Sequence, residues 1–259
     1  MSQPFTPDEV DRYARHLVLR EIGGPGQQRL KAARVLVVGA GGLGSPAALY
    51  LAAAGVGVIG LVDPDTVALS NLQRQVLFSA ADVGVLKVDA GRDRLSALNP
   101  AIQIESHALE VTKANAAQVL AGYDLVLDGT DDFATRFAVN ATCVAAGIPL
   151  VSGAIARWTG QVGVFAGKPC YRCLVPEIPP EAETCAGVGV VGALGGVIGS
   201  LMAMEAIKRI VDAGEGLTGR LLIYDALAGE TRTVTVGADP DCPACGQGGH
   251  KSRPEEDAG

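Results

Sequence analysis

The sequence has few aromatic residues, no surplus of positive charge and no long apolar run. Phe, Trp and Tyr make up only 4% of the 259 residues, and the formal net charge is −7. Phosphate binding needs clustered Lys and Arg, so the charge argues against nucleic acid or an anionic membrane surface as the main partner. No stretch reaches the roughly 20 apolar residues that span a bilayer, and the polar segment 1–20 contains no apolar signal core. We therefore expect a cytoplasmic protein.

Hydrophobic residues are plentiful at 48%, and the 34 glycines suit a tightly packed α/β protein. Apolar periodicity predicts strands and helices in alternation, which is typical of a Rossmann-like, mostly parallel sheet with helices on both faces. The expected helices are 6–20, 27–33, 47–54, 88–97, 114–120 and 134–145, and the expected strands are 34–39, 56–62, 102–107, 125–127 and 149–153.

The pattern changes after Gly153. An antiparallel strand pair is expected over 154–165 with its turn near Thr159-Gly160, then an irregular segment over 170–188. A helix over 195–211 and strands over 220–224 and 231–236 complete the chain, and they extend the sheet with antiparallel strands. Without a repeat or a linker, we expect one domain over 1–250 and a disordered tail over 251–259.

A glycine-rich loop follows the first strand, with Gly39, Gly41, Gly42 and Gly44 in the pattern GAGGLG. Glycines allow a backbone to approach phosphates, and the N-terminus of the next helix offers free N–H groups to an anion. Asp63 ends the next strand, where a carboxylate can accept hydrogen bonds from a ribose. A plain tight turn is the structural alternative, and the motif does not distinguish NAD from ATP.

A polar segment with an arginine comes directly after Asp63. Arg74 can make bidentate contacts to phosphate oxygens, which suits a triphosphate better than hydride transfer. Lys87, at the start of a helix, could neutralise a leaving pyrophosphate, although the spacing fits a solvated lysine equally well. The residues expected near the nucleotide in this part of the chain are Asp65, Ser70, Asn71, Gln73, Arg74 and Lys87.

Three carboxylates, Asp128, Asp131 and Asp132, lie at the carboxyl end of a strand. Ligands of open α/β sheets bind at that edge, and Mg²⁺ near a triphosphate is usually held by one or two carboxylates. We expect Asp131 to bind Mg²⁺. Asp132 is the candidate for capping the next helix, although it also lies where a nucleotide would contact it.

Two C-x-x-C pairs predict a structural zinc site with four thiolate ligands. The pairs are Cys170 with Cys173 and Cys242 with Cys245. Disulfides and a redox C-x-x-C are the weaker alternatives in a chain without a secretion signal. Cys185 lies in a loop, where it is either a nucleophile or a small filler residue.

The combined motifs resemble the ubiquitin-activating superfamily in its bacterial form, the molybdopterin-synthase and thiazole-biosynthesis adenylyltransferases of the MoeB/ThiF type. The resemblance covers about Tyr13 to Cys245. The segments that carry it are RYAR at 12–15, the loop 39–44, SNLQRQ at 70–75, TDD at 130–132, CYRC at 170–173 and GVIGS at 196–200.

The resemblance implies that ATP and Mg²⁺ are used to adenylate the C-terminal carboxylate of a small ubiquitin-like sulfur-carrier protein ending in Gly-Gly. It implies that Asn71, Arg74 and Lys87 surround the phosphates, and that Arg15 reaches the phosphates of a partner subunit in a homodimer. Carriers of this kind serve molybdopterin, thiamine and thiolated-tRNA synthesis. Cys185 is where thiazole-type members carry a cysteine that links covalently to the carrier.

The sequence departs from the family pattern in three places. Ala186-Gly187 follows Cys185 where relatives commonly have Ala-Glu-Ala-Gly, and Asp132 stands where many have Asn. The chain also ends soon after Cys245, so we expect a separate protein to donate the sulfur. Two other functions compete with adenylation: an NAD-dependent oxidoreductase, which leaves Arg74 and the cysteines unexplained, and a scaffold that binds a carrier without activating it.

Overall fold

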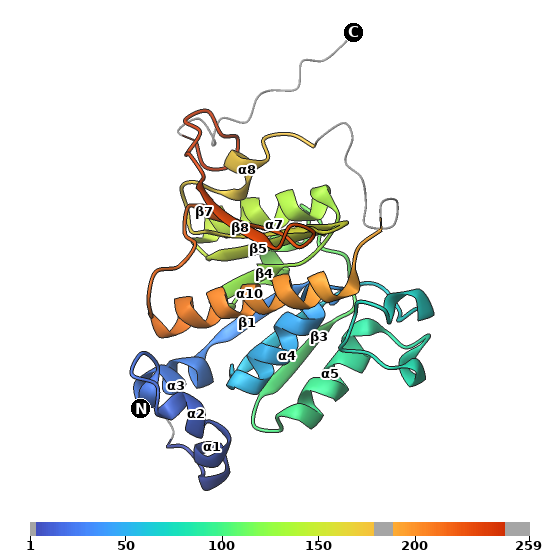
Figure 1. The fold of residues 1–259 in the computed structure, drawn as a ribbon, viewed down its shortest axis with the longest axis vertical. Coiled ribbons are helices and arrows are strands. Elements are labelled where there is room, and N and C mark those ends of the chain that lie inside the picture. Colours follow the sequence, from blue (N-terminus) through green and yellow to red (C-terminus); the bar gives the residue numbers. More distant parts are fainter. Residues whose placement is uncertain (1–3, 179–188, 247–259) are drawn as a thin grey trace.

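The computed structural model describes residues 4–178 and 189–246 (Figure 1). Its helices are α1 (Pro7–Arg12), α2 (Ala14–Leu17), α3 (Gly23–Ala32), α4 (Gly44–Ala54), α5 (Lys87–Leu98), α6 (Ala116–Leu120), α7 (Phe133–Ala146), α8 (Tyr171–Leu174) and α10 (Gly192–Val211), with 3₁₀ helices η1 (Leu69–Asn71) and η2 (Ala80–Asp82). Its strands are β1 (Arg34–Val38), β2 (Val58–Val62), β3 (Gln103–His107), β4 (Leu125–Asp128), β5 (Leu150–Ala156), β6 (Thr159–Phe165), β7 (Arg220–Asp225) and β8 (Glu230–Thr235).

The strands form a single eight-stranded sheet in the order β3-β2-β1-β4-β5-β6-β7-β8. From β3 to β5 all neighbours are parallel, and from β5 to β8 all are antiparallel. The expected α/β class with an antiparallel C-terminal extension is therefore confirmed. The strand order reverses between β1 and β4, which is where ligands of open α/β sheets bind.

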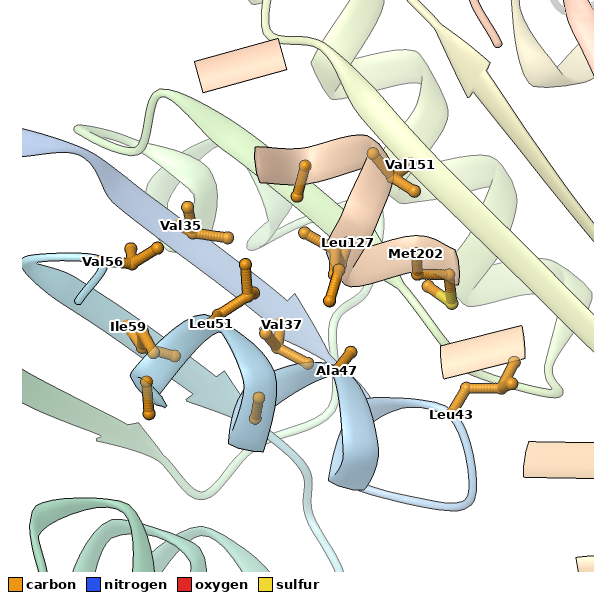
Figure 2. Packing of buried hydrophobic residues seen from close by; sticks show 14 of the residues in the cluster. Val35, Val37, Leu43, Ala47, Leu51, Val56, Ile59, Leu127, Val151 and Met202 are labelled. Carbon is orange, nitrogen blue, oxygen red and sulfur yellow. The ribbon is translucent and has the colours of Figure 1, made fainter. Parts of the chain in front are cut away.

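Alternate side chains of the central strands build two separate apolar layers, one on each face of the sheet. Val35 and Val37 of β1 pack with α4 and α10, as Figure 2 shows. Leu36 and Val38 belong to the other layer, with α6 and α7. Successive residues of a strand point to opposite faces, so an uninterrupted apolar strand is what a sheet covered on both sides requires.

The expected helix over 6–20 is divided in two. Thr6 caps α1 with a full capping box, but α1 ends at Arg12 and Tyr13 breaks the helical conformation. The Tyr13 side chain is buried, and its hydroxyl accepts a hydrogen bond from Asn99 Nδ2 at 2.9 Å. Burial of Tyr13 against a distant part of the chain therefore overrides the local helical pattern.

Two further boundaries also differ from the expectation. Helix α3 begins at Gly23, four residues before the expected helix over 27–33, because Pro25 occupies the first helical turn where its missing N–H costs nothing. Strand β5 continues to Ala156, so the hairpin turns at Arg157-Trp158 and not at Thr159-Gly160. Helix α8 occupies part of the segment expected to be irregular.

The long helix α10 lies across α4 and the middle of the sheet (Figure 1). Within 4–178 and 189–246, no helix has the length and apolar character to cross a membrane.

Candidate functional site

A cavity of about 670 Å³ opens at the carboxyl ends of β1, β2 and β4 and at the β5–β6 hairpin. Sites for small molecules and cofactors usually have volumes of about 300 to 1,000 Å³. Ten residues expected near the nucleotide line it: Gly39, Gly41, Gly42, Asp63, Asp65, Asn71, Arg74, Lys87, Asp131 and Asp132. Gly44, Ser70 and Gln73 do not line it.

The glycines of the loop after β1 serve two different purposes. Gly39 has a φ of 86°, and a Cβ at Gly44 would lie 1.9 Å from the Gly39 carbonyl oxygen, so both are required by the turn itself. At Gly41 and Gly42 a Cβ would make only ordinary contacts, the nearest at 3.6 Å. Both face the cavity, so the absence of side chains there keeps space for a ligand.

A buried ion pair joins Lys87, at the start of α5, to the carboxylates that directly follow β2. Lys87 Nζ lies 2.7 Å from Asp65 Oδ2 and 3.3 Å from Asp63 Oδ1, and only 6% of Lys87 is exposed. The alternative that Lys87 is a solvated lysine is therefore wrong. Asp63 also accepts hydrogen bonds from the Ala40 and Asp65 amides. Burial raises the pKa of Asp63 above its usual value, although Lys87 and these amides act to lower it.

The segment 69–75 supplies polar groups from the other side of the cavity. The Arg74 side chain passes over Gly42, and its Nη1 donates to the Ser70 carbonyl at 3.1 Å. Asn71 Oδ1 accepts from the Ala68 amide. Gln75 is buried, lines the cavity and has an Oε1 with no hydrogen-bond partner among the described residues. Gln75 belongs to the SNLQRQ motif, but it was not among the residues expected near the nucleotide.

The three carboxylates at and just after the end of β4 have three different surroundings. Asp128 Oδ1 accepts from the amide and hydroxyl of Thr130 at 3.0 and 2.7 Å. Asp132 caps α7 by accepting from the Thr135 amide, as expected; burial acts to raise its pKa, but hydrogen bonds from Thr135 hold that pKa below its usual value. Asp131 is exposed to the cavity, with no hydrogen bond or ion pair to any described residue. An open carboxylate that faces such a cavity fits a divalent cation.

Arg136, on α7, also lines the cavity, although only 4% of it is exposed. Its guanidinium donates to the Thr130 and Gly153 carbonyls and to Ser152 Oγ. Burial acts to lower the pKa of Arg136, but the nearby Asp128 raises it. Arg136 was not predicted from the sequence, because a lone arginine inside an apolar helix belongs to no motif. Its place four residues after a capping aspartate was the available signal.

Arg15 is a further expected residue that does not line the cavity. Arg15 is on α2, which packs on α3, and the end of α3 bonds to the start of β2 through Leu30 and Gly57. Arg15 is therefore at the end of the strands opposite the cavity, with α1–α3 at one end of the molecule in Figure 1. Cys185 lies outside the described residues.

The four cysteines of the C-x-x-C pairs gather at one point. Their Sγ atoms all lie within 4.8 Å of one another, with Cys170 to Cys242 at 3.6 Å and Cys173 to Cys245 at 3.4 Å. Tetrahedral zinc with bonds of about 2.3 Å needs sulfur atoms about 3.8 Å apart, so the cluster fits. Burial acts to raise the pKa of Cys242, but the Cys245 and Ala244 amides lower it to about 7, which favours a thiolate.

Several known proteins are similar to this chain in sequence or in fold. The family model described as ThiF family matches residues 13–244. The sulfur carrier protein adenylyltransferase of Thermus thermophilus is 49% identical over 93% of this chain and 93% of its own length. The probable adenylyltransferase/sulfurtransferase MoeZ of Mycobacterium tuberculosis is 51% identical over 91% of this chain, which spans only 62% of MoeZ. A crystal structure of E. coli MccB with ATP has a TM-score of 0.77 and 25% identity, over 90% of this chain and 74% of MccB.

Proposed function

The chain belongs to the ThiF family, and from this premise we propose that it adenylates the C-terminal carboxylate of a small sulfur-carrier protein ending in Gly-Gly. One observation carries the proposal. A single cavity joins a glycine loop open to a ligand, the cations Arg74 and Lys87, and the unpaired carboxylate of Asp131. An NAD-dependent oxidoreductase has no need of the last three.

The cations of the cavity suit the bonding changes of adenylation. An oxygen of the carrier carboxylate forms a bond to the α-phosphorus of ATP, and the bond from that phosphorus to the α–β bridging oxygen breaks, so that pyrophosphate leaves with the electron pair. The carboxylate is already ionised, so no protein base is required. Arg74, Lys87 and Asn71 hold the phosphates, and fixed positive charge offsets the repulsion between the two anions. Asp63 accepts hydrogen bonds from the ribose.

In this mechanism Lys87 must leave Asp63 and Asp65 to contact the phosphates. Its ammonium group is held by Asp63 and Asp65. A triphosphate carries more negative charge than either aspartate, so the lysine can turn to it without leaving the cavity. We assign Asp65 the role of holding Lys87 ready at this position.

Two metals are part of the proposal. Asp131 holds the Mg²⁺ that accompanies ATP and partly neutralises the phosphates. Cys170, Cys173, Cys242 and Cys245 hold a structural zinc that joins the segment after β6 to the C-terminal segment. Four thiolates would complete the tetrahedral coordination of zinc, so the metal would have no open coordination position for catalysis.

Pyrophosphate exchange tests the adenylation directly. With a recombinant sulfur carrier ending in Gly-Gly, wild-type protein is expected to exchange labelled pyrophosphate into ATP, whereas a carrier lacking the final glycine is not a substrate. Asp131→Ala should abolish exchange. Asp93→Ala is the matched control, because Asp93 is an exposed carboxylate on α5 outside the cavity. Normal exchange by Asp131→Ala, or tight NAD binding without exchange, contradicts the proposal, and AMP formation by the wild type excludes a scaffold.

The position of Arg15 supports a homodimer in which each subunit supplies this side chain to the cavity of its partner. Arg15→Ala and Asp131→Ala are then both inactive alone. Mixed and reassociated in equal amounts, they should regain about a quarter of the wild-type activity, because half of the dimers combine one intact site with one defective site. No recovery in dimers shown to exchange subunits counts against Arg15 acting across the interface.

The proposal has five further parts. Residues 1–250 act as one adenylyltransferase domain, and the reaction takes place in the cytoplasm, where thiols remain available as metal ligands. A separate protein donates the sulfur. Cys185 is a candidate for a covalent link to the carrier. The products serve molybdopterin, thiamine or thiolated-tRNA synthesis.

A further inference from the structure

Arg136 is a buried cation, and the three hydrogen bonds that it donates all go to other parts of the protein. No ion pair joins it to a carboxylate within 4–178 and 189–246. A guanidinium has five N–H donors. Arg136 directs three of them to the Thr130 and Gly153 carbonyls and to Ser152 Oγ at 3.3 Å, and the Tyr171 side chain also interacts with the guanidinium. The side chain is therefore arranged to position protein groups.

The group that it positions most directly is the peptide unit that precedes Asp131. Arg136 Nη2 donates to the Thr130 carbonyl, while Asp128 Oδ1 accepts from both the amide and the hydroxyl of Thr130. Asp128 thus holds the amide and the hydroxyl of Thr130, and Arg136 holds its carbonyl. Asp131 follows immediately and has no hydrogen bond of its own to a described residue, so its direction into the cavity depends on how Thr130 is held.

The same guanidinium ties this loop to the neighbouring strand. Asp128 of β4 pairs with Ser152 of β5, and Arg136 bonds both Ser152 Oγ and the Gly153 carbonyl, the latter at 2.7 Å. One side chain therefore ties the loop after β4 to the middle of β5. A lysine has a single nitrogen and cannot span the same three acceptors.

Arg136 is in turn supported from the four-cysteine cluster. Tyr171 lies between two of the cysteines, its ring centroid is 5.8 Å from the Arg136 guanidinium, and only 4% of it is exposed. The Tyr171 amide donates to Asn140 Oδ1 at 2.8 Å, and Asn140 is on α7 with Arg136. A chain of contacts thus runs from Cys170 through Tyr171 and Arg136 to Thr130.

We propose that Arg136 is a positioning residue that orients Asp131 toward the divalent cation of the bound nucleotide, and that the four-cysteine cluster supports it through Tyr171. The inference rests on the proposed function, because it assumes a nucleotide with its metal in the cavity. It assigns the cysteine cluster an influence on the nucleotide site in addition to joining two segments of the chain.

Mn²⁺ binding tests this positioning without a carrier protein. Free Mn²⁺ is measured by its electron paramagnetic resonance signal, using zinc-loaded protein with and without a non-hydrolysable ATP analogue. Arg136→Lys keeps the charge but not the geometry. It should weaken Mn²⁺ binding in the presence of the analogue on the order of tenfold, as is typical when a bond that orients a metal-binding carboxylate is lost. Its affinity for the analogue without metal should stay within about twofold of wild type, a change of less than half a kcal/mol.

Two more variants make the result decisive. Arg172→Lys is the matched control: Arg172 packs on Phe137 at 4.3 Å and donates to the Pro176 carbonyl, but does not reach Thr130, so Mn²⁺ binding should be unchanged. Tyr171→Phe removes only the hydroxyl, and it should weaken Mn²⁺ binding with the zinc content unchanged. If Arg136→Lys does not fold, this variant decides.

Three results overturn the inference. The first is wild-type Mn²⁺ affinity in Arg136→Lys, or in Tyr171→Phe where that variant decides. The second is an equal loss of analogue affinity with and without Mn²⁺, because that indicates general damage to the cavity. The third is a wild-type protein that binds no Mn²⁺ with the analogue, which overturns the proposed function as well. The first two leave the proposed function intact.

Discussion

Alanine substitutions at two neighbouring glycines should separate stability from nucleotide binding. At Gly44 a new Cβ would lie 1.9 Å from the Gly39 carbonyl oxygen, 2.9 Å from the Gly39 carbonyl carbon and 3.1 Å from Val37 Cγ1. Two of these atoms belong to the backbone of the turn and the third to a buried strand residue. The start of α4 must therefore move away from β1.

At Gly42 the situation is different. The nearest atoms to a new Cβ are Arg74 Cγ at 3.6 Å and Arg74 Cδ and Ile155 Cδ1 at 3.7 Å, which are ordinary contacts with the flexible ends of side chains. The φ angle of Gly42 is not positive, so an L-residue fits without strain. The methyl group instead occupies the wall of the cavity, where the proposal places phosphates.

Overpacking at Gly44→Ala should cost about 3 kcal/mol, the upper end of the usual range, because backbone atoms do not yield easily. Gly42→Ala should change stability by less than about 0.5 kcal/mol. Its affinity for ATP should fall roughly tenfold, which corresponds to about 1.4 kcal/mol.

Urea unfolding measures the first pair of values, and isothermal titration with a non-hydrolysable ATP analogue measures the affinity. The reasoning is refuted if Gly42→Ala binds the analogue as tightly as the wild type, or if the two variants lose equal stability.

Three further predictions concern charges and thiols. Lys87→Met should cost about 3 kcal/mol at neutral pH, because it leaves Asp63 as a buried carboxylate without its cation. Burial already raises the pKa of Asp63, and without Lys87 that pKa rises further, so this group favours the folded state fully below pH 3.8 and less as the pH rises. In denaturant unfolding the difference from wild type should shrink toward acid, and a constant difference would show that Asp63 is not the cause. Cys245→Ser should lower the zinc content from about one per chain and lower the Tm, measured by atomic emission and calorimetry; an unchanged Tm after complete zinc loss contradicts a structural role. Cys185→Ala should keep pyrophosphate exchange and abolish any thioester or disulfide-linked carrier adduct seen by mass spectrometry, and loss of exchange would instead assign Cys185 to adenylation.

Local chemistry made several features predictable. Thr6 caps α1 and Asp132 caps α7 through bonds that span three residues, so the neighbouring sequence contains all that is needed. The two C-x-x-C pairs were predicted to meet, because thiolates at that spacing have one common use in a reducing compartment. The strand β1 was predicted from its apolar run alone.

Features that depend on distant partners were missed or misjudged. The segment around Tyr13 has a continuous helical pattern, but contact with Asn99 breaks the helix. The spacing of Lys87 in the sequence fitted a solvated side chain as well as a ligand contact. Only the return of α5 to the end of β2 places Lys87 between Asp63 and Asp65.

The sequence by itself determined the alternation of strands and helices in the parallel part of the sheet, the family, the open glycine loop and the two cysteine pairs that cluster. Each of these rests on residue type and short spacing, which the chain carries before it folds. Only the tertiary structure decided which polar groups share the cavity and which hold one another. Arg136 shows this: its partners lie on two segments, Thr130 after β4 and Ser152 and Gly153 on β5, and the parallel pairing of β4 with β5 brings their oxygens within reach of one guanidinium.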